Sequence, residues 1–257
     1  STTPLDASVP MRHPPAGWRP SLPTGATGSW FLQTQERIVL SMLSGANDHR
    51  TASRSETSVL DVGGGHGQLA VPLCREGYRV TVVGSDESCQ RRIADLVGSG
   101  KCSFRAGNLV ALPFADKSFD VVLCFRLLPH CTQWHRLIGE LCRVANLAVI
   151  ADYPATRSFN AVVPLLFGAK KRIEKNTRDW TNFRHSDIRD QFASHGFVPA
   201  GRKAQFFLPM ALHRALKVRG LSSGSEALFR ITGLTALFGS PVIVDMRRQQ
   251  AAPGHAI

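Results

Sequence analysis

The stretch Val59-Leu60-Asp61-Val62-Gly63-Gly64-Gly65-His66-Gly67 determines the fold that we expect for this chain. Its first part is an apolar run that predicts a buried strand, with an acidic residue at the strand's end. The glycines that follow predict a tight turn into a helix, because glycine adopts positive φ and lets a ligand approach the backbone. Amides at the start of that helix can meet the carboxylate of a ligand. We therefore expect a small-molecule site at this turn.

A turn that binds a nicotinamide dinucleotide is the rival interpretation. That turn has the pattern G-x-G-x-x-G, which would require glycine where this chain has Gln68. The acidic Asp61 before the first glycine also suits a ligand with an α-ammonium group better than it suits a pyrophosphate. A glycine turn that only packs tightly is the purely structural alternative.

Further motifs follow at the ends of the next strands. The second predicted strand, Tyr78 to Gly84, leads to Asp86, whose carboxylate can accept hydrogen bonds from both hydroxyls of a ribose. After it comes Gly107-Asn108-Leu109, and then Leu112-Pro113-Phe114-Ala115-Asp116-Lys117-Ser118-Phe119-Asp120-Val121-Val122. The order of these motifs, rather than any one of them, is informative.

Together the motifs resemble class I S-adenosylmethionine-dependent methyltransferases, in particular the branch similar to the methyltransferases of ubiquinone and menaquinone biosynthesis. The resemblance covers about residues 58–155. It implies a Rossmann-like, doubly wound α/β fold, whose seven-stranded mixed sheet has an antiparallel last strand. It also implies S-adenosyl-L-methionine as the methyl donor and S-adenosyl-L-homocysteine as the product.

The resemblance also assigns donor contacts. The methionine end would lie against Asp61, Gly63, Gly65 and Gly67, with Phe125 beside it. Asp86 would bind the ribose, and Asn108 with the backbone of Leu109 would meet the adenine. The chain departs from the family at Asn108, where Asp is common, and at Glu87, where an apolar residue often stacks on adenine.

The rest of the chain alternates between strand-like and helix-like segments, which favours a sheet covered by helices on both faces. We expect strands at 58–62, 79–84, 102–106, 119–125, 147–152, 197–208 and 241–247. We expect helices at 30–43, 67–76, 88–97 and 133–143, and a helical insertion at about 209–236.

Composition predicts one domain with a flexible Pro-rich arm. Residues 1–28 form the arm, and residues 29–257 a single domain with a cofactor-binding core at 58–155 and substrate-side elements at 156–240. No apolar run approaches the ~18–20 residues that span a bilayer. Six cysteines without a C-x-x-C pair favour free thiols in the cytoplasm, and we expect no metal site.

Positive charge is concentrated in the second half of the chain. The net charge is +12, and residues 151–257 carry 16 Lys and Arg against 7 Asp and Glu. Such a field favours an anionic substrate, a nucleic acid or an anionic membrane surface. The apolar segment Phe159 to Phe167 leads into Lys170-Lys171-Arg172, a pattern that fits peripheral membrane contact as well as the basic end of an ordinary helix.

Several side chains are candidates for contact with the methyl acceptor. His130 follows the fourth strand and could act as a general base, or could serve as a hydrogen-bonded structural residue. Tyr153 follows the fifth strand and could contact the substrate or take part in catalysis. Arg126 could bind an anionic group or pair with a carboxylate, and the aromatic Trp30 and Phe31 predict a hydrophobic acceptor surface.

The leading prediction is therefore methyl transfer to a small or lipid-like acceptor that is partly hydrophobic, with an anionic group as an option. One alternative is an RNA methyltransferase, although no N-P-P-Y-like tetrad follows the fourth strand, where Phe125-Arg126-Leu127-Leu128 stands. The other is a partner subunit that binds the donor without catalysis. The acceptor atom and the oligomeric state stay open at this point.

Overall fold

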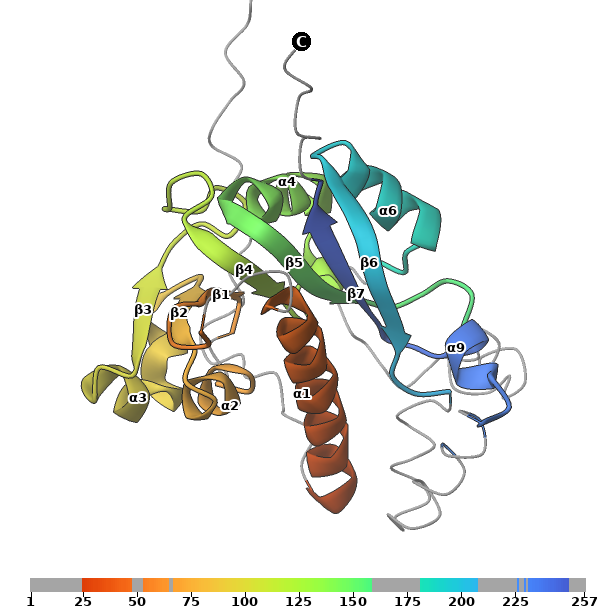
Figure 1. Cartoon of the computed structure of the whole chain (residues 1–257), viewed down its shortest axis with the longest axis horizontal. Helices are drawn as coiled ribbons and strands as arrows, with labels where there is room; N and C mark the ends of the chain where they lie inside the picture. The colour runs from red at the N-terminus through yellow and green to blue at the C-terminus, as the bar shows by residue number, and fades with distance from the viewer. Residues whose placement is uncertain are drawn as a thin grey trace, which may run out of the picture.

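A seven-stranded sheet with the order β3-β2-β1-β4-β5-β7-β6 forms the centre of the structure (Figure 1). The computed structural model describes residues 25–47, 53–64, 67–158, 181–207, 226, 229 and 231–249. The last strand, β7, is antiparallel to β5 and β6, whereas β1 to β5 pair in parallel. The strands are β1 (Ser58–Val62), β2 (Arg79–Gly84), β3 (Cys102–Ala106), β4 (Phe119–Cys124), β5 (Ala145–Tyr153), β6 (Phe197–Ala204) and β7 (Val242–Arg248).

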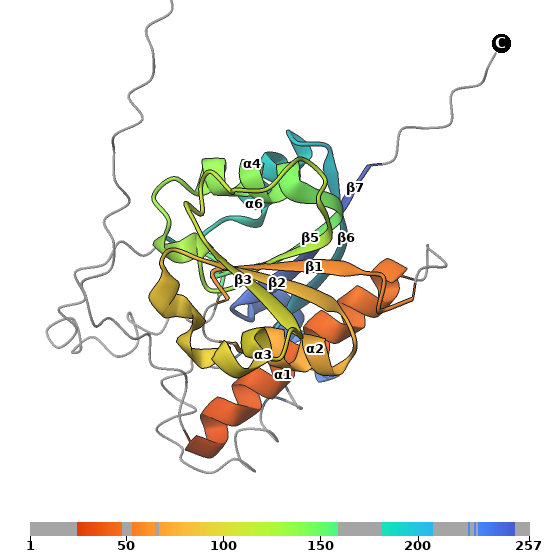
Figure 2. The same ribbon diagram turned by 90° about the vertical axis from the view of Figure 1, so that its left-hand side faces the viewer.

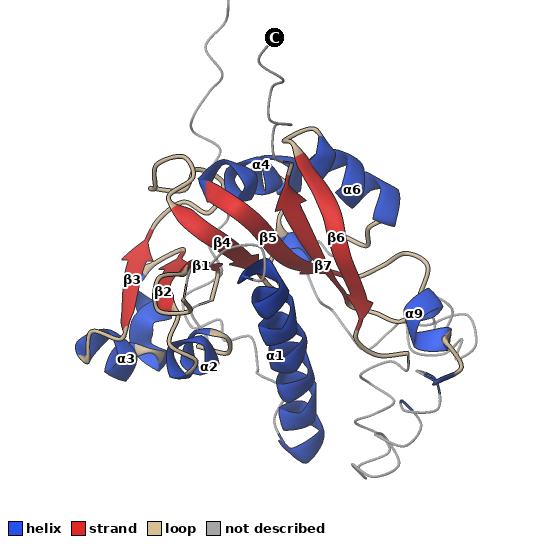
Figure 3. Ribbon diagram, viewed as in Figure 1, coloured by secondary structure: helices blue, strands red, loops and turns tan. Residues whose placement is uncertain are grey.

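Helices cover both faces of this sheet, as Figure 2 shows. One face carries α1, α2 and α3, and the opposite face carries α4 and α6 (Figure 3). Short 3-10 turns, η1 (Glu87–Arg92) and η2 (Leu128–His130), follow β2 and β4. The α-helices are α1 (Gly25–Asn47), α2 (Ala70–Arg75), α3 (Ala94–Gly98), α4 (Trp134–Val144), α6 (His185–Ala193) and α9 (Leu234–Phe238).

The central strands β1, β4 and β5 are largely apolar, as is typical of parallel strands whose two faces are both buried. In β5, alternate residues enter different cores: Val149 and Ala151 pack with α4 and α6, whereas Ala148 and Ile150 pack with α1 and α2. Two hydrophobic layers therefore hold the sheet between the helices and fix where its carboxyl edge lies.

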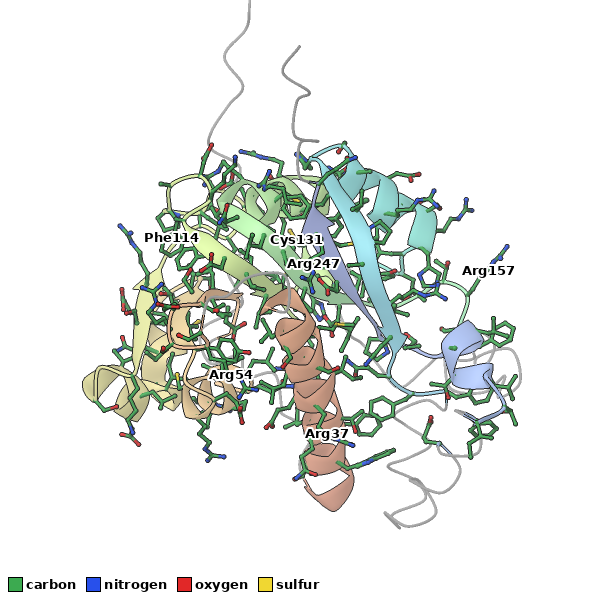
Figure 4. The ribbon with its side chains drawn as sticks, viewed as in Figure 1. Arg37, Arg54, Phe114, Cys131, Arg157 and Arg247 are labelled. Atoms are coloured by element: carbon green, nitrogen blue, oxygen red, sulfur yellow. The ribbon has the colours of Figure 1, made fainter. Side chains whose placement is uncertain are left out.

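Helix α1 is fastened to the sheet at its C-terminal end by Arg247 of β7, which Figure 4 labels. The guanidinium forms a paired salt bridge with Asp245, with both N···O distances 2.7 Å. It also donates to the carbonyl oxygens of Met42 and Gly45, which belong to the last turns of α1. Such carbonyls lack partners inside the helix, and a cation there also offsets the helix dipole. The N-terminal half of α1 extends past the carboxyl edge of the sheet (Figure 1).

The expected seven-stranded mixed sheet with an antiparallel last strand is confirmed, and all seven strands lie within a few residues of their predicted ends. Three expectations differ in detail. The helix expected at 88–97 is split into η1 and α3, the helix expected at 67–76 begins only at Ala70, and the strand expected at 197–208 ends at Ala204. Helix α1 begins at Gly25, so its first residues belong to the predicted arm. Helix α6 was not predicted.

Other predictions fall outside the described residues. These are the arm up to residue 24, the segment 159–180 with its basic cluster, and most of the insertion at 209–236. Among the described helices, none is both long enough and apolar enough to cross a membrane.

The packing of α6 yields a stability prediction. Phe192 has no exposed surface and lies 6.5 Å from Phe197 of β6, measured between ring centroids. Phe192→Ala should lower the free energy of unfolding by about 3–5 kcal/mol, because it leaves a cavity between α6 and the sheet. Urea denaturation measures this change. Phe238→Ala is the matched control: that ring is 44% exposed, so its loss should cost below about 1 kcal/mol. Equal losses in the two variants would contradict the packing described here.

Candidate functional site

The order of the strands reverses between β1 and β4, and this switch point defines the candidate site. Moving outward from this point, the neighbouring strands are β1, β2 and β3 in one direction and β4 and β5 in the other. In open α/β sheets, ligands bind at the carboxyl ends of the strands beside such a reversal. The segments that leave β1 and β4 there are the glycine turn and the residues from Phe125 to His130.

The glycine turn takes a form that only glycine tolerates. Gly63 and Gly67 have positive φ angles of 78° and 68°. A Cβ atom at Gly64 would lie 1.9 Å from Oδ2 of Asp61, and one at Gly67 would lie 2.7 Å from Ile93. The backbone of the turn therefore rests directly against the carboxyl group of Asp61. Gly65, also predicted as a contact, lies outside the described residues.

Asp86 follows β2 and caps the next turn. One carboxylate oxygen accepts from the backbone N–H of Ser88 at 2.8 Å and from the Ser88 hydroxyl. These hydrogen bonds lower the pKa of Asp86 below its ordinary value. The side chain is exposed at the carboxyl edge, so an ionised carboxylate stands beside the end of β2, where the ribose was predicted.

The predicted adenine contacts lie after β3. Oδ1 of Asn108 accepts from the backbone N–H of Val110 at 3.0 Å, which fixes the orientation of the amide. Asn108 itself is exposed, whereas the side chain of Leu109 is buried in the core below. The amide group and the adjacent backbone therefore face the edge, and Leu109 anchors them.

Two buried acidic side chains and a half-buried arginine lie near one another where β1, β4 and β5 end. Asp61 and Asp152 are both only 2% exposed, and Arg126 interacts electrostatically with each of them. Burial raises the pKa of Asp61 to about 7 and that of Asp152 to about 6, and in each case the nearby guanidinium opposes the shift. One cation is thus shared between two buried carboxylates.

The backbone takes part in this cluster. Arg126 has a φ of 57°, an uncommon conformation for a residue other than glycine. Its backbone N–H donates to Oδ1 of Asp152 at 2.6 Å, a charge-assisted hydrogen bond that supports the conformation. This contact ties the end of β4 to the end of β5.

Helix α1 reaches the cluster through Gln35, which is 5% exposed. Nε2 of Gln35 donates to Oδ2 of Asp152 at 3.3 Å, and its Oε1 accepts from the side chain of Gln68 in the glycine turn. Gln35 was not predicted from the sequence. The partners lie 117 residues apart, and no local pattern marks such a pairing.

The predicted aromatic residues are buried around the same edge. Phe125 directly follows β4 and is 9% exposed. Trp30 and Phe31 pack against Phe206, which lies just beyond β6, with ring centroids 5.1 Å and 4.0 Å away. The structure therefore joins the start of α1 to the end of β6 through aromatic contacts.

The two predicted catalytic residues occupy different environments. His130 is exposed at the end of the turn η2, four residues after Arg126, whereas Leu128 and Pro129 of that turn are buried. Tyr153 is 1% exposed, and its hydroxyl hydrogen-bonds Nδ1 of His185 at 2.8 Å beneath α6. Burial raises the pKa of Tyr153 to about 12. His185 was not predicted from the sequence, because only the fold brings it next to Tyr153.

Among the described residues, no group of three His, Cys, Asp or Glu side chains could hold a metal ion.

Known proteins resemble this chain in sequence and in fold. A family model for a methyltransferase domain matches residues 60–147. Norajmaline N-methyltransferase of Rauvolfia serpentina is 30% identical over 164 residues, which are 61% of this chain and 56% of that protein. Ubiquinone biosynthesis O-methyltransferase of Rickettsia akari (strain Hartford) is 26% identical over 144 residues, which are 52% of this chain. That match too spans 56% of the relative's own length.

The fold is shared with solved structures. Magnesium protoporphyrin IX methyltransferase from Synechocystis PCC 6803, solved with bound SAH, superposes with a TM-score of 0.59 at 17% identity. The superposition covers 88% of this chain and 89% of that one. At this identity the likeness shows the architecture alone.

The contact between Asp61 and Gly64 yields a prediction for the turn. Gly64→Ala should lower the free energy of unfolding by about 1–3 kcal/mol, because the added methyl group overlaps the buried carboxylate. It should also weaken the binding of S-adenosylhomocysteine, measured by calorimetry. Gly45→Ala in α1 is the matched control, since no atom lies within 4 Å of its Cβ. Alanine favours helices, so that variant should be equal in stability or up to about 1 kcal/mol more stable.

The burial of Asp61 yields a prediction for pH. The folded protein keeps the Asp61 proton up to about pH 7, whereas the unfolded chain releases it near the ordinary value of 3.8. Between these values the folded state binds more protons, so this group's contribution to stability is lost as the pH rises. Relative to Asp61→Asn, the parent should lose up to about 1.4 kcal/mol per pH unit between pH 4 and pH 7. Urea denaturation across this range measures the difference; a parent that gains stability relative to the variant would contradict the assignment.

Proposed function

We propose that this chain, which belongs to the class I S-adenosylmethionine-dependent methyltransferases, transfers a methyl group to a small or lipid-like, partly hydrophobic acceptor. One observation carries the proposal: three groups lie together at the switch point. They are the glycine turn that rests on Asp61, the exposed Asp86 and the oriented amide of Asn108. These groups stand on three neighbouring strands, in the order in which the methionine, ribose and adenine parts of the donor would meet them.

The residues present fit the donor. Gly64 and Gly67 pack their backbone against Asp61 and Ile93, where any side chain would collide, so the turn keeps this shape only with glycine. Asp86 would accept from the ribose hydroxyls, and Asn108 would meet the adenine edge. When bound, S-adenosylmethionine supplies a methyl group on a positively charged sulfur. The protein then needs to exclude water and to align the acceptor atom with the carbon–sulfur bond.

Two observations support a partly hydrophobic acceptor. Trp30 and Phe31 bring aromatic surface to the N-terminal half of α1, which extends past the carboxyl edge. Aromatic contacts continue between Phe207 and Phe229, whose ring centroids are 4.4 Å apart. The relatives named above are small-molecule methyltransferases, which agrees with this acceptor class. The positive charge of residues 151–257 supports an anionic group on the acceptor.

His130 is the side chain that we propose as base. In the reaction, the acceptor atom forms a bond to the methyl carbon, and the carbon–sulfur bond breaks with its electron pair passing to sulfur. An oxygen or nitrogen acceptor also loses a proton, which the exposed imidazole of His130 can take. Tyr153 does not enter the proposal, because its hydroxyl is buried and paired with His185.

The proposal is tested by donor binding and by an acceptor panel. Calorimetry should show that S-adenosylhomocysteine binds the parent. Asp86→Ala should weaken this binding by about 1.5–3 kcal/mol, the scale for lost hydrogen bonds to a charged group. Glu87→Ala is the matched control, because it removes the neighbouring exposed carboxylate and should leave affinity within about twofold. Mass spectrometry should then detect methylated product with at least one hydrophobic phenol, amine or carboxylic acid, and none with RNA.

One outcome would overturn the donor assignment, and another would overturn only the acceptor class. A parent that binds neither S-adenosylmethionine nor its product would remove the donor assignment. Methylated RNA together with a silent small-molecule panel would leave the donor assignment intact and replace the acceptor class.

A further inference from the structure

Three basic side chains lie near one another beyond the end of β5, on the face of the sheet that carries α6. Arg157 follows β5, His185 opens α6, and Arg202 belongs to β6. Both arginines are exposed, and His185 is half-buried. Both guanidinium groups interact electrostatically with His185, so three segments of the chain bring positive charge to one place.

A short bridge between two segments places Arg157 beside His185. Ala155 and Phe183 form this bridge in the parallel direction. Arg157 comes two residues after Ala155, and His185 comes two residues after Phe183. Because the two segments run in the same direction, the two side chains leave the bridge together.

The register of the sheet brings Arg202 to the same level. Val244 of β7 pairs with Ala151 of β5 on one side and with Arg202 of β6 on the other. Ala151 lies two residues before the end of β5, so Arg202 stands near the carboxyl edge of the sheet.

Tyr153 orients the imidazole of His185. Its hydroxyl hydrogen-bonds Nδ1 at 2.8 Å, and burial raises the pKa of Tyr153 to about 12, so the phenol keeps its proton at neutral pH. When the phenol donates to Nδ1, the ring proton is on Nε2, which presents an N–H donor away from Tyr153. Burial lowers the pKa of His185, and the guanidinium groups of Arg202 and Arg157 lower it further.

No acidic side chain neutralises the two arginines. Within the described residues, neither guanidinium has a salt bridge. The carboxylates of α6 have other partners: Asp187 accepts from the hydroxyl of Ser186 at 3.0 Å, and Asp190 pairs with Arg189 at 2.9 Å. Figure 4 shows Arg157 extending from the ribbon into solvent. The group therefore has positive charge and N–H donors available for an anion.

We propose that Arg157, His185 and Arg202 bind an anionic group, a carboxylate or a phosphate, on the methyl acceptor. The proposal rests on the proposed function and deepens it, because it assigns the anionic end of the acceptor to named side chains. A guanidinium matches the oxygens of either anion with parallel N–H bonds. Tyr153 is a positioning residue that acts through His185. The donor groups follow β1, β2 and β3, so this site holds the end of the acceptor that points away from the donor.

The test compares three probes of equal chain length: octanoate, octyl phosphate and the neutral octanamide. They are titrated by NMR into the parent saturated with S-adenosylhomocysteine. At least one anion should bind about 10-fold more tightly than octanamide, a modest factor because the arginines are exposed. The anion with the higher affinity identifies the group, and the ring protons of His185 should shift as it binds.

A double variant and a matched control separate a local site from the general charge of the protein. In Arg157→Gln/Arg202→Gln the preference for the anion should fall to within about twofold of unity. Arg136→Gln/Arg189→Gln removes the same two charges from exposed positions of α4 and α6, and should keep the parental preference within about twofold. Both variants replace exposed side chains, so both should keep the parental melting temperature within a few degrees.

Three results would overturn this assignment: no preference for either anion in the parent, equal losses in the two double variants, or ring protons of His185 that do not move. Each would leave the proposed function intact, because the binding of S-adenosylhomocysteine is measured separately. A parent that fails to bind S-adenosylhomocysteine overturns the proposed function instead.

Discussion

The hydrogen bond from the backbone N–H of Arg126 to the buried carboxyl group of Asp152 is the constraint on which the candidate site depends. Asp61, Arg126 and Asp152 come from the ends of β1, β4 and β5, so the cluster joins the three central strands at their carboxyl edge. This hydrogen bond, 2.6 Å long, ties the end of β4 to the end of β5. The strand ends therefore keep a fixed spacing, and the glycine turn, which rests on Asp61, is held with them.

The same cluster explains why α1 belongs to the site although it precedes the sheet in sequence. Arg247 fastens the C-terminal end of the helix to β7, and Gln35 fastens its middle to Asp152 and to the glycine turn. Between these contacts, Val39 and Leu43 pack into the core. The aromatic residues at its start are consequently placed over the edge by a helix that is held at two points.

The parts of the structure that the sequence predicted are those with local causes. A glycine turn needs glycine where φ is positive, and an acidic residue can cap the turn that follows it, so both motifs are visible in a few neighbouring residues. Long apolar runs likewise indicated the central strands. In contrast, the bond between Gln35 and Asp152 depends on the whole fold, and so does the bond between Tyr153 and His185. The positive φ of Arg126 has no sequence signal at all, because it is stabilised by a carboxylate 26 residues away. Helix α6 was missed because its apolar residues, Ile188 and Phe192, are too few to set a period.

The long separation between Gln35 and Asp152 also bears on the order of events during synthesis. A nascent chain that has emerged only as far as β4 already carries the glycine turn, Asp86 and Asn108. It lacks Asp152, so neither the backbone of Arg126 nor the middle of α1 has its anchor. Closing a contact across 117 residues is slow compared with forming the local turns. The edge of the candidate site is therefore fully tied together only once β5 has joined the sheet.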